Sequence, residues 1–71
     1  MRSLRVGEHA LLLVVDGPRE AVAAREQVLA LARPGAEAGL VAPVDVVPAA
    51  TTVLLDGLPD SGAVEAWRHR L

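Results

Sequence analysis

An unbroken apolar run at residues 10–15, Ala-Leu-Leu-Leu-Val-Val, constrains the fold of this chain more than any other feature. Asp16-Gly17-Pro18 follows it, a cluster of residues that breaks regular structure. The run has the length of a strand and is far shorter than the roughly 20 apolar residues that cross a membrane. It therefore predicts a strand in the core of a globular protein.

Both faces of this predicted strand are apolar. Successive side chains of a strand point to opposite faces, so the odd-numbered residues share one face, and Leu12 and Val14 share the other. Leu54, between two further apolar residues, repeats the pattern. Two interpretations remain open: a central strand whose second face is mildly exposed, or a second face that another domain or subunit covers. Leu12, Val14 and Leu54 are thus candidate partner-binding residues.

Turn and cap signals divide the rest of the chain. Strands are expected at residues 3–6, 10–15, 44–47 and 51–55. Pro18 suits the first turn of a helix, because its missing N–H would have no partner there. Asp60 or Ser61 can cap a second helix. Pro48 belongs at a strand end or bend, since proline cannot donate to a sheet. The predicted order is β-β-α-β-β-α.

Each predicted helix has an apolar face. The first carries Ala21, Ala24, Val28, Leu31 and Ala32 at helical spacing. Pro34-Gly35 should end it, and residues 36–42 are either a loop or a frayed extension. The second helix has, within reach of one face, Val64, Trp67, Arg68 and Leu71. We expect an α+β fold: a two-layer sandwich with a small, mainly antiparallel sheet and two helices on one face.

Composition restricts the class of protein. Seventy-one residues allow one domain, spanning residues 1–71. There is no cysteine, so neither disulfides nor thiolate metal sites form, which fits a reducing cytosol. Charged residues near the N-terminus break any signal peptide, and the predicted location is cytoplasmic. A net charge of −2 with scattered arginines argues against nucleic-acid binding.

The sequence contains no convincing catalytic or metal-binding group. His9 and His69, the two histidines, have no His or Cys neighbour at metal-ligand spacing, and solvated surface positions are expected for both. Neither Ser3 nor Ser61 lies in a nucleophile-elbow context, and no phosphate-binding glycine motif occurs. Asp45 either has a raised pKa inside an apolar strand or points outward at a sheet edge. We predict no catalytic residue, metal or cofactor.

Two segments together resemble the KipI/PxpB family of 5-oxoprolinase subunits, also called allophanate hydrolase subunit 1. Residues 5–13 read Arg-Val-Gly-Glu-His-Ala-Leu-Leu-Leu, similar to the family's Gly-Asp/Glu turn before Ala-Leu-Leu-Val. Residues 44–56 read Val-Asp-Val-Val-Pro-Ala-Ala-Thr-Thr-Val-Leu-Leu-Asp, similar to its Val-Val-Pro-Ala segment and following strand. The resemblance extends over nearly the whole chain. The motif positions are Gly7, Glu8, Pro48, Ala49 and Thr51.

The resemblance implies the N-terminal domain alone, because the family's cyclophilin-like barrel has no counterpart in these residues. It implies a non-catalytic assembly module of an ATP-dependent 5-oxoproline-hydrolysing complex, with a homologous 5-oxoprolinase subunit or the barrel as partner. The alternatives are a KipI-like inhibitor of a sensor histidine kinase and a free-standing domain that senses a small ligand. A homo-oligomer is also compatible. Where the family often has arginine, this chain has Thr51, which puts that contact in doubt.

Overall fold

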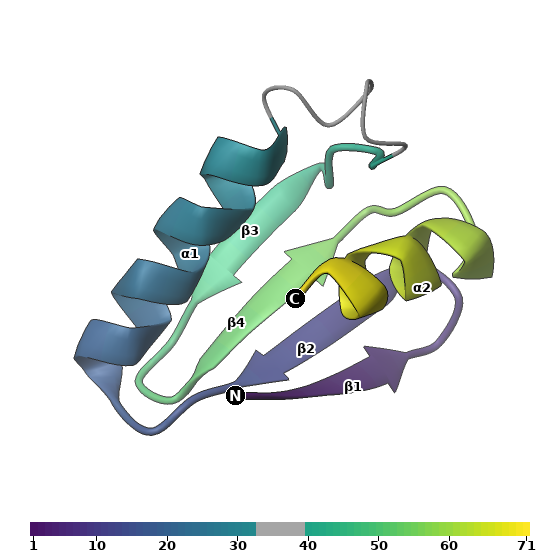
Figure 1. Ribbon diagram of the computed structural model, residues 1–71. Helices are drawn as coiled ribbons and strands as arrows, with labels where there is room; N and C mark the ends of the chain where they lie inside the picture. Colours follow the sequence, from purple (N-terminus) through teal and green to yellow (C-terminus); the bar gives the residue numbers. More distant parts are fainter. Residues whose placement is uncertain (33–39) are drawn as a thin grey trace.

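Four strands form one antiparallel sheet in a computed structural model that describes residues 1–32 and 40–71. The elements are β1 (Arg2–Val6), β2 (Ala10–Val14), α1 (Pro18–Ala32), β3 (Asp45–Pro48), β4 (Thr52–Asp56) and α2 (Ser61–Arg70). Their order confirms the predicted β-β-α-β-β-α arrangement and the α+β class. Across the sheet the strands lie in the order β1-β2-β4-β3, so β2 and β4 are central (Figure 1).

Turns at opposite ends of the sheet join the paired strands. Gly7 adopts a φ of 66° in the β1–β2 turn, a conformation that glycine adopts without steric penalty. At the other end, the Ala49 N–H donates to the Thr52 carbonyl at 2.8 Å and closes the β3–β4 hairpin. With this bond, β3 ends at Pro48 and β4 begins at Thr52. Both strands therefore lie one residue later than the predicted ranges 44–47 and 51–55. Pro48 is the last residue of edge strand β3, as expected.

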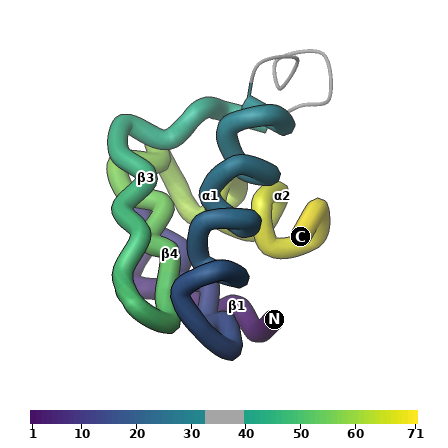
Figure 2. Tube along the Cα trace, turned by 90° about the vertical axis from the view of Figure 1, so that its left-hand side faces the viewer, coloured from purple at the N-terminus to yellow at the C-terminus, as the bar shows by residue number. Residues whose placement is uncertain are grey.

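Helix α1 begins at Pro18, and its small apolar face packs on the sheet. Ala21, Ala24 and Val28 are buried, which confirms the predicted helical face, and Leu31 and Ala32 pack against the same core. The predicted Pro34-Gly35 stop lies outside the described residues. Figure 2 shows α1 and α2 on the same side of the strands, so the molecule has one helical and one sheet layer.

Helix α2 is capped by Asp60, whose Oδ1 accepts a hydrogen bond from the Ala63 N–H at 2.8 Å. Ser61, the other candidate cap, is the first helical residue. Trp67 is fully buried, and its indole Nε1–H donates to the Val41 carbonyl at 2.8 Å. Arg68, which the sequence places within reach of the apolar face, is instead exposed.

The core cluster lies between the helices and the odd-numbered face of β2 and β4. Ala10, on the even-numbered face of β2, is also buried but lies outside this cluster. No buried polar or charged residue occurs in the described part of the chain. The hydrophobic effect and close packing therefore hold the two layers together. The core cluster comprises Leu11, Leu13, Ala21, Ala24, Val28, Leu40, Val53, Leu55, Leu58, Ala63, Val64 and Trp67.

Candidate functional site

The face of the sheet away from the helices carries a continuous line of large apolar side chains. Strand register places Leu4 opposite Leu12, Leu12 opposite Leu54, and Leu54 opposite Val47. These four residues, here called the apolar row, cross all four strands on one face. We call that face the open face. Leu4 is 48% exposed and Val47 50% exposed, while Leu12 and Leu54 on the central strands are half-buried.

Further apolar side chains flank the row. Val6, also on β1, points to the open face and is 49% exposed. Val14 is half-buried and pairs with Thr52 on β4. The structure thus brings together the three predicted partner-binding residues, Leu12, Val14 and Leu54. It adds edge-strand residues that the sequence reasoning missed, although the alternation in residues 2–6 was a usable signal.

Charged groups occupy two diagonally opposite corners of the open face. Asp45 and Asp56 are exposed and lie directly opposite each other at one end of β3 and β4. Arg2 pairs with Val14 at the far end of the other edge strand, β1. Within the described residues, Arg2 forms no ion pair. Asp45 is therefore an outward-facing residue of an edge strand, as one of the two sequence interpretations expected.

The motif residues of the family resemblance lie at opposite ends of the sheet. Gly7 and Glu8 form the β1–β2 turn. Pro48, Ala49 and Thr51 form the β3–β4 hairpin, where the Thr51 carbonyl accepts a hydrogen bond from the Val15 N–H at 2.9 Å. All five are exposed. Their positions explain the turn chemistry of the motifs, but the two motifs do not converge on one site.

His9 has a more definite structural role than a solvated histidine. Its side chain is exposed, but Nδ1 lies 2.8 Å from the Leu58 carbonyl oxygen. Because a carbonyl oxygen only accepts, Nδ1 carries the proton in this contact. The Leu58 N–H donates to the His9 carbonyl at 2.9 Å. These two hydrogen bonds connect the loop before α2 to the β1–β2 turn. The sequence gives no sign of this contact, because the two residues lie far apart in the chain.

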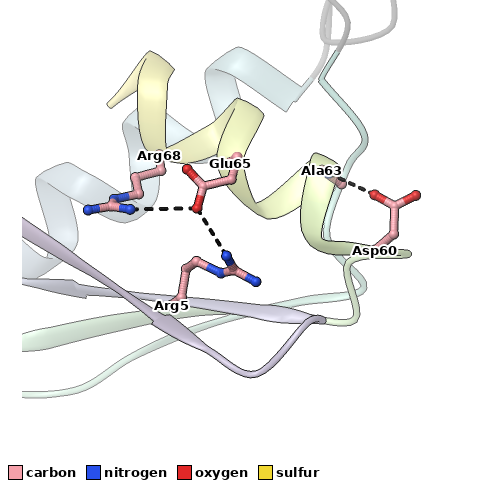
Figure 3. A network of polar contacts seen from close by, with 5 residues as sticks. All are labelled: Arg5, Asp60, Ala63, Glu65 and Arg68. Atoms are coloured by element: carbon pink, nitrogen blue, oxygen red, sulfur yellow. Dashed lines mark hydrogen bonds and ion pairs between the residues drawn. The ribbon is translucent and has the colours of Figure 1, made fainter.

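A small polar network connects α2 to β1 on the helical side. The Glu65 carboxylate lies 3.5 Å from the guanidinium of Arg5 and 3.5 Å from that of Arg68 (Figure 3). All three side chains are partly exposed, so water and salt screen the attraction and each pair is worth little. The network therefore adds only a weak contact between α2 and β1.

A pocket of about 260 Å³ lies beside the first turns of α1. Its carboxylates, Asp16 and Glu20, are both exposed. Across the part of the chain that the structure describes, no cluster of three or more His, Cys, Asp or Glu is placed to hold a metal ion. The same residues include no helix both long and apolar enough to cross a membrane. The pocket is lined by Met1, Val15, Asp16, Glu20, Ala23, Ala24 and Gln27.

Comparison with known proteins adds no relative. No protein-family model, no curated protein and no solved structure matches this chain. The resemblance to the KipI/PxpB family therefore stays a prediction that rests on the two sequence segments.

Proposed function

We propose that this chain is a non-catalytic assembly module that docks on a protein subunit through its open face. The observation that carries the proposal is the apolar row, because two leucines at its centre and two half-exposed residues at its ends form one surface. Large contiguous apolar surfaces on small domains mark interaction sites more often than scattered apolar residues do.

The size of the open face supports docking. Four strands about 4.8 Å apart, with five residues that rise about 3.4 Å each, give a face of roughly 19 by 17 Å, or about 300 Å² in projection. The largest apolar patches on typical monomers measure about 300–600 Å² and are often functional. The open face as a whole reaches the lower end of this range, and its apolar part is smaller because Arg2, Asp45 and Asp56 occupy its corners. A partner sheet or helix pair laid across the row would remove most of this surface from water.

The family resemblance supplies the class of partner. It implies assembly with a homologous 5-oxoprolinase subunit, and a covered open face is the physical requirement that such an assembly would meet. In this proposal the chain contributes binding surface, and the ATP-dependent hydrolysis of 5-oxoproline belongs to the assembled complex.

Co-elution with the homologous 5-oxoprolinase subunit from the same genome tests the proposal. Val47→Glu places a charge at the end of the apolar row, on an exposed edge position that tolerates it. Val22→Glu is the matched control, because Val22 is a 58% exposed valine on α1, on the helical side. We expect the native chain and Val22→Glu to co-elute with the homologous subunit and Val47→Glu to elute alone. Absence of co-elution for the native chain, or equal co-elution of all three proteins, would refute the proposal.

A further inference from the structure

The charges at the corners of the open face lead to a more specific inference about the partner. Asp45 and Asp56 face each other across adjacent strands, and like charges directly opposite are destabilising. Arg2, at the diagonally opposite corner, has no acidic partner among the described residues. A single copy cannot join these groups, because the whole sheet lies between them.

The geometry points to a second copy of this chain as an occupant of the open face, with the two sheets packed face to face and their strands crossed at nearly a right angle. This inference rests on the proposed function, because both use the open face as the docking surface. It goes further by naming a second occupant, a copy of this chain that covers the open face when the homologous subunit does not, together with the symmetry and the residues that set the orientation.

Strand spacing determines the crossing angle. Arg2 and Asp45 are separated by three strand spacings, about 14 Å, and by about four residues along the strands, also about 14 Å. The line between them therefore runs at about 45° to the strands and passes between Leu12 and Leu54. A two-fold axis in the interface, perpendicular to this line, places each Arg2 over the second copy's Asp45. The same axis turns the strands of one copy by about 90° relative to the other, a recognised class of sheet packing.

Aligned packing does not join the charges. A two-fold axis parallel to the strands places Arg2 over the hairpin end of the second copy's β3, near Ala49. An axis perpendicular to the strands places it over the second copy's Val6. With either of these axes, no cation of the second copy lies near Asp45 and Asp56. In the crossed arrangement Leu12 and Leu54 of the two copies meet at the centre, so one orientation satisfies both the apolar row and the charges.

The size of the face predicts weak association. Two faces of about 300 Å² each give about 600 Å² in projection, and the relief of the side chains raises the accessible surface removed to at most about 1,000 Å², below the usual size of specific interfaces. We expect a dimer with a dissociation constant on the order of 10–100 μM.

Charge reversal with mixing tests the arrangement by sedimentation of the purified 71-residue chain. Arg2→Glu sets Glu against Asp45 in its homodimer, and Asp45→Arg sets Arg against Arg2. Each variant should dimerise at least about tenfold more weakly than the native chain, because like charges meet at two symmetric contacts. An equimolar mixture can form a heterodimer of the two variants. In one of its contacts the Glu introduced at position 2 faces the Arg introduced at position 45, and in the other the unchanged Arg2 faces the unchanged Asp45. The mixture should therefore recover association to within about threefold of native.

Controls separate this inference from folding and from the proposed function. Arg19→Glu changes the same charge on α1, on the helical side, and should leave self-association unchanged. Circular dichroism and the emission of Trp67 check that each variant folds. A native chain that stays monomeric at about 1 mM, or variants whose mixture associates no better than either alone, would overturn the crossed dimer. Co-elution with the homologous 5-oxoprolinase subunit is measured separately, so a failure of the crossed dimer can be distinguished from a failure of the proposed function.

Discussion

Leu54 and Leu55 are neighbours on the central strand β4. Truncating each in turn tests whether one face of the sheet is covered by the helices and the other is open, as the proposed function requires. Leu55 is fully buried between the sheet and the helices, while Leu54 is half-buried on the open face. Leu54→Ala and Leu55→Ala make the same chemical change in the same strand. Differences in β-propensity therefore largely cancel, and the difference in unfolding free energy reports what covers each side chain.

The expected magnitudes follow from burial. Leucine to alanine deletes three carbon atoms, worth about 2.4 kcal/mol at about 0.8 kcal/mol each when fully buried. Leu55→Ala also leaves a cavity under the helical layer, so we expect a loss of about 3–4 kcal/mol. Leu54→Ala leaves no cavity, because no layer covers it, and its loss should be about 1 kcal/mol. A chain of this length has only about 4–10 kcal/mol of stability in total.

Urea unfolding followed by circular dichroism and Trp67 fluorescence measures both losses. With a slope near 1 kcal/mol per molar urea, the two variants should differ by about 2–3 M in midpoint. The experiment is run at a few micromolar and repeated at a higher concentration, because self-association through the open face would stabilise the native chain. Equal losses for the two variants, or a larger loss for Leu54→Ala, would refute the assignment of the faces.

Two further predictions concern the loop between β4 and α2. Asp60→Ala removes the acceptor of the Ala63 N–H and should lower stability by about 1 kcal/mol, a fall of about 4–8 °C in melting temperature, while Asp60→Asn should retain most of the cap. Gly57 has a φ of 76°, and a Cβ there would overlap the Val44 side chain. Gly57→Ala should therefore be clearly more destabilising in thermal melts than Gly7→Ala, which carries the same kind of φ but meets nothing within 4 Å. A Gly7→Ala loss as large as that of Gly57→Ala would show that the backbone conformation, and not the contact with Val44, dominates.

Local signals were sufficient for the elements of the fold. Pro18 and Asp60 are chemically suited to the first turn and the N-cap of a helix, and each begins the helix that the sequence predicts. All four strands differ from the predicted bounds by one residue. β3 and β4 lie one residue later, β1 begins one residue earlier at Arg2, and β2 ends one residue earlier at Val14. The hydrogen bond from the Ala49 N–H to the Thr52 carbonyl accounts for where β3 ends and β4 begins. The ends of a strand depend on which residues of the neighbouring strand form hydrogen bonds with it, and residue type alone does not determine this.

Contacts between residues far apart in the chain could not be predicted from the sequence, because they also depend on which segments the fold brings together. The His9 contact with Leu58 joins residues 49 positions apart, and the Trp67 contact with Val41 joins residues 26 positions apart. Neither has a local pattern, since a carbonyl acceptor is present at every residue. The sequence could indicate that Trp67 belongs to an apolar helical face, but not which carbonyl its indole N–H would reach.

Some features of the open face follow from the sequence, and others depend on the tertiary structure. Alternation along the strand determined that Leu12, Val14 and Leu54 oppose the core side chains, because successive residues of a strand point to opposite faces. Only the tertiary structure decided that Leu4 and Val47 extend this surface, and that Arg2 and Asp45 lie at opposite corners. Those placements depend on the pairing of β2 with β4, two strands that are far apart in the chain. Non-local pairing, which no local pattern encodes, converts separate apolar residues into one surface.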